Sequence, residues 1–408
     1  MSELPQSWDP RQVALNRDEK NQFLLRPGQI LAGPGDAADV QKVLPDWKPS
    51  DRRPFGVTQF VTTPKDPKDP AREIHDALAR IRKATSERPQ GPARVAPNHV
   101  LVGEGITLTG EPRIQGGPGS SVRVAKPPRQ LPHRTKRADD GKGVKIAVLD
   151  TGLFEHPWLA AVQQAPNAAD TWDADHDDYA DAEAGHGTFI AGLILQVAPA
   201  ATVHVVKVLD SHGLGDDLTV ARAIEQLPPD VDIINLSLGG YTDDDAAPLA
   251  IATALNALRS QRKAIVAAAG NANRTRPFWP AAFKQVLGVG ATEQKDGQWR
   301  RAGFSNHGWW VDATARGVDL QSTFTKGKTK AATGDHPDPA DPWIAFAGWA
   351  AWDGTSFASP IAAALIARAM TRSHIHSAAD AQAHLQSTAP PAPQPDFPLA
   401  VNLDELTP

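Results

Sequence analysis

The segment VKIAVLDTG, residues 144–152, decides the fold class of this chain of 408 residues. It is a nearly continuous apolar run that ends in an acidic residue and a turn, and four later segments have the same character. These segments span residues 203–209, 231–236, 264–269 and 286–290. Runs with so few polar positions are typical of strands buried on both faces of a parallel sheet. Helical patterns lie between them, so the sequence predicts an α/β domain: a doubly wound, mostly parallel sheet with helices on both faces.

The residues before this domain have a different pattern. Seven prolines interrupt residues 1–55, and this spacing predicts short elements only. Further on, a strand is predicted at 57–61, a helix with one apolar face at 71–84, and a second strand at 95–102. The N-terminal part is therefore predicted to be a smaller α+β or irregular region.

Composition shifts place the expected boundaries. Residues 114–142 are basic and contain prolines, as linkers do, and residues 389–408 are expected to form an extended, Pro-rich C-terminal tail. The predicted organisation is an N-terminal region at 1–140, a main domain at 143–388, and the tail.

Composition also excludes several kinds of chemistry. The chain contains no cysteine, which rules out disulfides, thiolate nucleophiles, zinc–thiolate sites and iron–sulfur clusters. Hydrophobic residues make up 41% and charged residues 22%, as in globular proteins. Neither a secretory signal nor a membrane-spanning stretch is recognisable, so a cytoplasmic location and no membrane partner are expected.

Charge is distributed unevenly along the chain. Residues 1–140 contain 23 Lys and Arg against 17 Asp and Glu, whereas the remainder contains 19 against 30. The basic residues are scattered among prolines and acids, so no nucleic-acid partner is expected. Docking of the N-terminal region on the acidic remainder is the favoured interpretation, and an accidental asymmetry is the plainest alternative.

Four polar residues stand at the ends of predicted elements. Asp150 follows a buried strand, His186 lies between two glycines before an apolar helix, Asn271 follows another strand, and Ser356 opens an Ala/Ile-rich helix. Asp150, Asn271 and Ser356 are each more often structural when taken alone, since Ser and Asp commonly cap helices and Asn is common in turns, whereas for His186 alone the two readings are equal. An acid, a base, a hydroxyl and an amide are also the groups that nucleophilic catalysis on a carbonyl requires.

Together these blocks resemble the subtilisin-like (subtilase) serine peptidases over about residues 143–388. The order Asp, His, Ser matches that family, which is a worked example of triad chemistry. The matching stretches are VLDTG at 148–152, GHGT at 185–188, AAGN at 268–271 and GTSFASP at 354–360. The resemblance implies a serine endopeptidase with Ser356 as nucleophile, His186 as general base and Asp150 as its orienting acid. Asn271 and the Ser356 backbone N–H would hold the oxyanion.

The resemblance also implies where a peptide would bind. Substrate would pair as an added strand with Ser237, Leu238, Gly239 and Gly240. The primary pocket would be walled by residues 237–239, by Ala268, Ala269 and Gly270, and by Phe278 with the residues after it. These stretches contain no acid, which argues against Lys or Arg at the cleaved residue. Phe278 stands where many relatives have Gly, so a shallow pocket that favours small residues is expected.

An acidic segment precedes His186. Its acids are Asp170, Asp173, Asp175, Asp177, Asp178, Asp181 and Glu183. The first part mimics the opening of a calcium loop, but Asp178 and Ala184 stand where that pattern wants Gly and Glu. The favoured interpretation is a solvated acidic loop that attracts basic substrates. No metal ligands are assigned and no cofactor is required, and structural calcium is left open.

The sequence also departs from the family pattern at several positions, and it leaves alternatives for the N-terminal region and for the function. Phe189 and Asp353 replace residues common in relatives, and an inserted segment after Thr323 is expected near the site. The N-terminal region is either a propeptide, cut at the basic stretch 134–137, or a permanent accessory domain. The function is expected to be hydrolysis of a protein or peptide. The alternatives are a specialised peptide-maturing protease, a peptide ligase, or a catalytically silent binding module.

Overall fold

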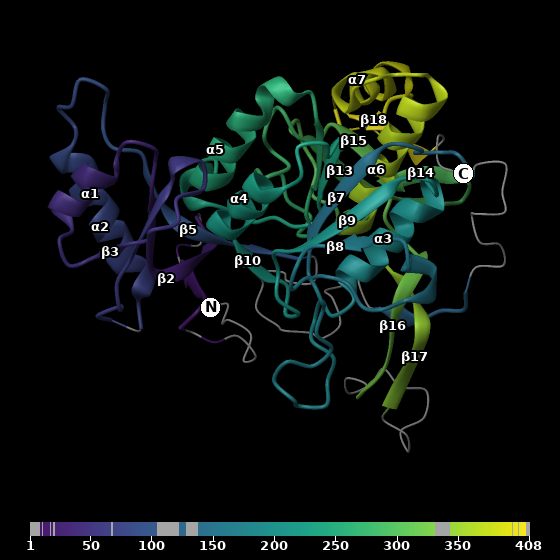
Figure 1. Ribbon diagram of the computed structural model, residues 1–408, viewed down its shortest axis with the longest axis horizontal. Helices are drawn as coiled ribbons and strands as arrows, with labels where there is room; N and C mark the ends of the chain where they lie inside the picture. Colours follow the sequence, from purple (N-terminus) through teal and green to yellow (C-terminus); the bar gives the residue numbers. More distant parts are fainter. Residues whose placement is uncertain are drawn as a thin grey trace.

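The computed structural model describes residues 9, 11–16, 18, 21–66, 68–103, 122–127, 138–330, 343–393, 395–398 and 400–404. Figure 1 shows two parts: an N-terminal part in purple and blue, and a larger part in teal, green and yellow. Among the described residues, no helix is both long and apolar enough to cross a bilayer.

The larger part is built on one sheet with strand order β8-β9-β7-β11-β12-β13-β15-β18. All neighbours in this order are parallel, and only β14, beside β13, is antiparallel. The strands are β7 (Lys145–Asp150), β8 (Gln163–Gln164), β9 (Thr202–Lys207), β11 (Ile233–Leu236), β12 (Ala264–Ala268), β13 (Leu287–Lys295), β14 (Gln298–Arg301), β15 (Ala313–Arg316) and β18 (Val401–Asn402). The predicted α/β fold class is confirmed.

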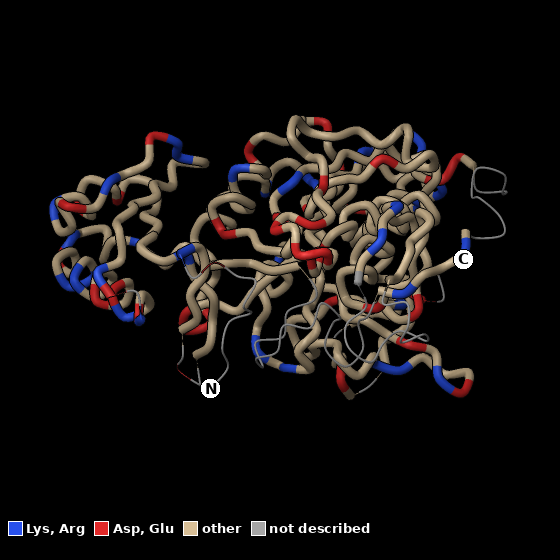
Figure 2. Tube along the Cα trace, turned by 90° about the horizontal axis from the view of Figure 1, so that it is seen from below, with Lys and Arg blue, Asp and Glu red and all other residues tan. Residues whose placement is uncertain are grey.

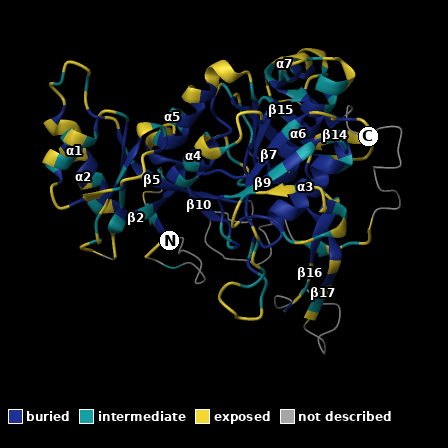
Figure 3. Ribbon diagram, viewed as in Figure 1, coloured by how far each residue is buried: buried dark blue, intermediate teal, exposed yellow. Residues whose placement is uncertain are grey.

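Helices cover both faces of this sheet. Alternate residues of β7 serve two cores: Ile146 and Val148 pack with α3 and α6, whereas Ala147 and Leu149 pack with α4 and α5. The helices are α3 (His186–Val197), α4 (Asp217–Gln226), α5 (Leu249–Leu258), α6 (Thr355–Arg372) and α7 (Ala378–Thr388). Figure 3 shows the strands β7 and β9 enclosed between them. A strand with two buried faces has to be apolar at nearly every position, which explains the runs in the sequence.

The N-terminal part is an antiparallel sheet covered by helices. Its strands are β1 (Ala14–Asn16), β2 (Phe23–Ala32), β3 (Lys48–Pro49), β4 (Thr58–Val61) and β5 (Val95–Val102), with α1 (Ala37–Val43) and α2 (Pro70–Ala84). The predicted apolar face of α2 is buried in the core below it. The strand predicted at 95–102 coincides with β5.

The expectation of short elements before residue 55 is wrong, because β2 has ten residues. Pro27 and Gly28 lie where the pairing of β2 with β5 shifts register between Leu25 and Ile30. Gly28 has φ +65°, and a Cβ there would lie 2.2 Å from the Thr62 carbonyl oxygen. A bulge of this kind tolerates a proline that a regular ladder would not.

The two parts are joined through one sheet. Strand β10 (Leu214–Asp216), which follows β9, pairs antiparallel with β5 of the N-terminal part. The guanidinium of Arg26 contacts the carboxylate of Asp216 at 3.0 Å, and both side chains are largely buried. Figure 2 shows both signs of charge scattered over the N-terminal part. Strand pairing and a shared apolar core join the two parts, together with this ion pair.

A third sheet has the order β16-β17-β6. It consists of β16 (Leu320–Lys330), β17 (Trp343–Trp352) and β6 (Arg123–Val124). In Figure 1, β16 and β17 project below the main sheet. Residues 122–127 of the predicted linker thus contribute a strand, while the stretch 134–137 lies outside the described residues.

The C-terminal residues differ from the expected extended tail. Strand β18 pairs with β15 and extends the main sheet, and Phe397 and Leu403 are buried. Apolar residues among the prolines explain the difference, because they bury surface that an extended tail would leave in water.

Candidate active site

Asp150 and His186 form a buried pair. His186 Nδ1 lies 2.8 Å from Asp150 Oδ1, and neither side chain has exposed surface. Asp150 is the last residue of β7, and its Oδ1 also accepts a hydrogen bond of 2.8 Å from the Thr151 N–H. A carboxylate bonded to Nδ1 fixes the tautomer and the orientation of an imidazole.

The two glycines beside His186 are required by close contacts. Gly185 precedes α3 with φ +89°, and a Cβ there would lie 2.4 Å from the Phe324 ring. A Cβ on Gly187 would lie 2.2 Å from the Gly152 carbonyl oxygen. These glycines let the first turn of α3 approach the end of β7, which brings His186 to Asp150.

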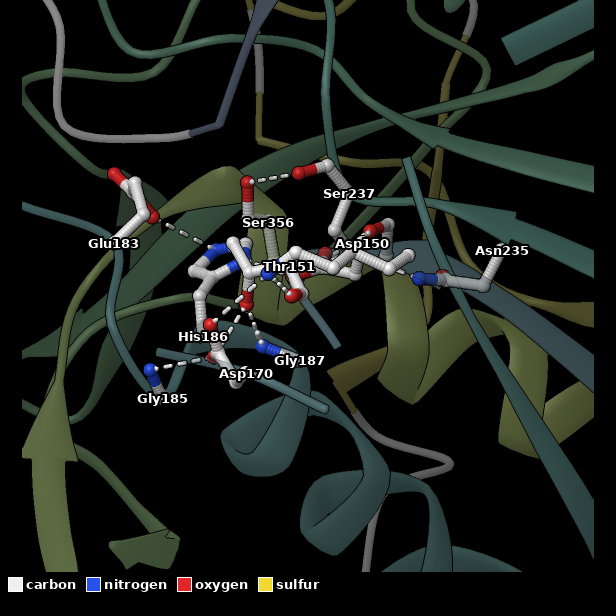
Figure 4. A network of polar contacts seen from close by, with 12 residues as sticks. Asp150, Thr151, Asp170, Glu183, Gly185, His186, Gly187, Asn235, Ser237 and Ser356 are labelled. Atoms are coloured by element: carbon white, nitrogen blue, oxygen red, sulfur yellow. Dashed lines mark hydrogen bonds and ion pairs between the residues drawn. The ribbon is translucent and has the colours of Figure 1, made fainter. Parts of the chain in front are cut away.

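Ser356 is the second residue of α6 and is buried. Its Oγ donates a hydrogen bond of 3.1 Å to the carbonyl oxygen of Ser237. The Ser237 hydroxyl in turn donates to the carbonyl oxygen of Ser356 at 2.7 Å, and Asn235 donates to that hydroxyl at 2.8 Å. Figure 4 shows Ser356 next to the His186 ring, and α3 packs against α6. The three predicted triad residues are thus brought together.

Asn271 stands at the same helix end. Its Oδ1 accepts hydrogen bonds from the backbone N–H and the hydroxyl of Thr355, at 3.1 and 3.0 Å. Because the oxygen of the amide is held by Thr355, the NH₂ end is the side that faces away from this contact. Sequence reasoning missed the role of Thr355, although it lies in the motif next to Ser356.

A small cavity adjoins Ser356 and Asn271. Its volume is about 30 Å³. Of the predicted substrate residues, the lining includes Leu238, Gly239, Ala268, Gly270 and Phe278. The other three do not line it. Ser237 bonds to Ser356 as described, Gly240 pairs with Trp279, and Ala269 donates to Val289.

Phe278 closes this cavity. A Cβ on Gly239 would lie 2.2 Å from the Phe278 ring, and one on Gly270 would lie 3.0 Å from it. Tyr241 packs edge-on against the same ring at 5.2 Å. The wall is therefore apolar and tightly filled.

The interpretation of a solvated acidic loop holds for only part of the segment. Asp175, Asp177 and Asp178 are exposed, but the side chains of Asp170 and Glu183 have no exposed surface. Asp170 Oδ2 accepts hydrogen bonds from the Thr151 hydroxyl at 2.8 Å and the Gly185 N–H at 2.9 Å. Burial raises the pKa of Asp170 to about 6, and Lys207 and these hydrogen bonds oppose that rise.

Asp170 therefore links the segments that carry Asp150 and His186, because Thr151 follows Asp150 and Gly185 precedes His186. Glu183 lies on the other side of the imidazole, with Oε2 at 3.6 Å from His186 Nε2. Asp170 and Glu183 were expected to be solvated because they lie in an acidic stretch of sequence. Their burial depends on contacts with residues that are distant in the chain.

Three acids of the exposed loop could offer ligands to a cation. The carboxylate oxygens of Asp173, Asp175 and Asp177 lie within 4.8 Å of one another. Asp173 already accepts from the N–H groups of Asp177 and Asp178, and calcium takes six to eight oxygens. The donor set in the described residues does not make a complete cage.

Aromatic side chains pack around the histidine. Trp352 at the end of β17 meets the His186 ring edge-on at 5.5 Å, and Phe357 lies at 5.2 Å. Phe189, which replaces a residue common in relatives, is buried 4.6 Å from Phe357. The second departure, Asp353, bonds through both oxygens to Arg123 of β6, each at 3.0 Å. The inserted hairpin thus supports the site, although residues 331–342 lie outside the described part.

Comparisons with known proteins agree with this geometry. The sequence profile of the subtilase family matches residues 141–402, so the chain belongs to the subtilase family. It is 32% identical over 273 residues to Subtilisin BL of Lederbergia lenta, covering 64% of this chain and 88% of that protein. It is 34% identical over 240 residues to Thermitase of Thermoactinomyces vulgaris, covering 55% and 81%. The family predicted from the sequence is confirmed.

Two further relatives are longer than the matched part. M-protease of Shouchella clausii (strain KSM-K16) is 32% identical over 273 residues, which are 64% of this chain and 62% of that protein. A solved structure of fervidolysin from Fervidobacterium pennivorans, "a keratinolytic enzyme related to subtilisin", superposes with a TM-score of 0.62 at 20% identity. The likeness covers 98% of this chain and 63% of fervidolysin, and it supports the fold of both parts.

Proposed function

We propose that this protein is a serine endopeptidase whose N-terminal part occupies the substrate cleft until it is removed. One observation carries the catalytic half: Asp150 and His186 are paired at 2.8 Å beside Ser356, at the carboxyl end of the sheet. Sites in open α/β sheets lie at this end. The names of the relatives, which are proteases, support the same reaction class.

The mechanism assigns each group a role. His186 removes the Ser356 proton as Oγ attacks the scissile carbonyl, and Asp150 stabilises the imidazolium that forms. The Asn271 NH₂ and the Ser356 N–H, at the positive end of α6, stabilise the oxyanion. His186 then protonates the leaving amine, which leaves an acyl group on Ser356. Water, deprotonated by His186, releases the acid.

The end of strand β5 indicates how the backbone of a substrate peptide would bind. The Val102 N–H donates to Gly239 at 2.8 Å, and the Gly239 N–H donates back at 2.9 Å. On the other side, the Gly103 N–H donates to Gly213 at 2.8 Å. A substrate would be held between the same two edges through backbone bonds.

The register identifies the subsites. In a bound peptide paired antiparallel in the register of Val102 opposite Gly239, the residue two positions further along would face Ser237, whose carbonyl oxygen lies beside Ser356 Oγ. The residue whose carbonyl is attacked, P1, would take that position, so Gly103 stands for P2.

The cavity walled by Phe278 is the proposed P1 pocket. With about 30 Å³ of space it admits a small side chain and excludes an aromatic one. Preference for small P1 residues follows from this volume.

A fluorophosphonate probe tests the proposal. Labelling of the processed wild type, with none in Ser356→Ala, is expected, and thiol reagents should not inhibit. Gels and N-terminal sequencing of the two proteins should show removal of the N-terminal part in the wild type alone. An unlabelled, fully processed wild type would favour the silent binding module, and an uncut but active chain would make the N-terminal part a permanent domain.

Product analysis separates the remaining alternatives. Hydrolysed peptide supports an endopeptidase, whereas transpeptidated peptide supports a ligase, and a single cleaved protein substrate supports a peptide-maturing enzyme. The protein or peptide substrate, the cytoplasmic location and any calcium requirement stay predictions.

A further inference from the structure

Glu183 stands beside the place of one substrate residue. We propose that Glu183 selects peptides with a basic side chain at P2, the position that Gly103 occupies in this structure. The inference rests on the proposed function and names a substrate class for the same site. It concerns P2 only, since the P1 pocket is apolar.

The direction of the missing side chain carries the inference. A Cβ built on Gly103 would lie 3.1 Å from Glu183 Cγ, Cδ and Oε2. A P2 side chain on the same backbone would therefore leave the strand directly toward this carboxylate. The three heavy atoms nearest to that Cβ, apart from those of Gly103 and its chain neighbours, all belong to Glu183.

The surrounding backbone holds Glu183 in this place. Its N–H donates to the Ser211 carbonyl oxygen at 2.9 Å, and a Cβ on Gly213 would lie 2.5 Å from Glu183 Cγ. Gly213 is also the residue that accepts the Gly103 N–H. The same short segment thus fixes both the peptide backbone at P2 and the carboxylate next to it.

Burial makes the carboxylate selective. Glu183 has no exposed surface when Gly103 lies above it, and its Oε2 is 3.6 Å from His186 Nε2. A larger P2 side chain has to displace the carboxylate end. Lys or Arg can do so while supplying a charged donor to the carboxylate, whereas Leu brings apolar atoms next to it and supplies no donor. An acidic P2 residue adds like-charge repulsion.

The wild type provides the first test. Peptides that share Ala at P1 and differ only at P2, with Gly, Lys, Leu or Glu, are compared by kcat/KM with the processed enzyme. We expect Lys to exceed Leu by about tenfold or more, and Glu to be the poorest. Equal values for Lys and Leu would overturn the inference.

Two variants locate the effect. In Glu183→Gln, the ratio of the Lys to the Leu peptide should fall by about tenfold, because the donor loses its charged partner. In Asp175→Asn, a matched loss of an exposed acid on the same loop, the ratio should persist. The wild-type ratio should also persist at high salt, since a covered pair is screened weakly.

The outcomes are separable from those of the proposed function. If the fluorophosphonate labels Ser356 and the Gly peptide is cut, but the ratio is one or responds equally to Asp175→Asn, only the inference fails. If the processed enzyme neither labels nor cuts any of the peptides, the proposed function fails and the inference with it. The ratio within one enzyme is the readout, so a general loss of activity in Glu183→Gln does not hide the result.

Discussion

Thr355 holds the side-chain oxygen of Asn271 through two hydrogen bonds, from its backbone N–H at 3.1 Å and its hydroxyl at 3.0 Å. The same hydroxyl accepts the Gly270 N–H at 2.9 Å. One residue of α6 therefore aligns the amide that is proposed to bind the oxyanion. Its neighbour in the sequence is Ser356, so the proposed nucleophile and the amide share one support.

Removing this hydroxyl should lower turnover. Thr355→Val is expected to reduce kcat by about fivefold, because a lost hydrogen bond of roughly 1 kcal/mol frees the Asn271 amide. Asn271→Leu should cost about 10²–10³, the magnitude known for the subtilisin case. Steady-state kinetics on one peptide measure both. Thr355→Ser keeps the hydroxyl and serves as control, and a Thr355→Val enzyme as fast as the wild type contradicts the assignment.

Shortening Phe278 should open the P1 pocket. In Phe278→Ala, we expect the ratio of kcat/KM for P1 Phe over P1 Ala to rise by at least about tenfold, since the ring fills the space beside Gly239. The change also leaves a cavity that costs up to about 3–5 kcal/mol of stability, so thermal unfolding is measured alongside. A wild type that cleaves best after large aromatic residues would refute this view of the pocket.

Acid should loosen the N-terminal part through His99. His99 Nε2 accepts the Asp243 N–H at 3.1 Å, and Phe23 packs on its ring. Burial, aided by His75, lowers the pKa of His99 to about 3. The folded pKa is depressed, so this stability is present above the unfolded value of about 6.5 and is lost as pH falls toward 3, about 2 kcal/mol by pH 5.

The measurement uses the uncut Ser356→Ala protein at pH 8, 6 and 5. Its free energy of unfolding, followed by denaturant titration, should fall with pH, and His99→Gln should remove a large part of that fall. Identical pH dependence in both proteins would show that other groups are responsible.

The ion pair of Arg123 with Asp353 should couple the linker to the Ser356 block. Asp353 also accepts the Asp319 N–H, and Arg123 is partly exposed, so solvent weakens the pair. We expect a coupling of about 0.5–1 kcal/mol in a double-mutant cycle of Arg123→Met and Asp353→Asn, read from denaturant unfolding. Additive effects would mean that the pair contributes nothing.

Local patterns in the sequence sufficed for much of the fold. The strand predicted at 264–269 is β12 (Ala264–Ala268). The sequence did not predict the ten-residue strand β2, because Pro27 indicates a break. In the structure, a bulge accommodates this proline, and the bulge depends on partner strands that the local sequence does not identify.

The sequence by itself determined the fold class, the family and the identity of the groups at the site. Burial on two sheet faces requires apolar residues at nearly every strand position, and the close contacts around His186 require glycine on both sides of it, so both features can be read from consecutive residues. Only the tertiary structure decided that β5 pairs with Gly239 beside Ser356, that Phe278 lines the cavity proposed as the P1 pocket, and that Glu183 is buried beside His186 instead of being solvated. These relationships join residues far apart in the chain. No local sequence pattern identifies the contact partners of these side chains. The partners are determined by strand pairing and packing in three dimensions.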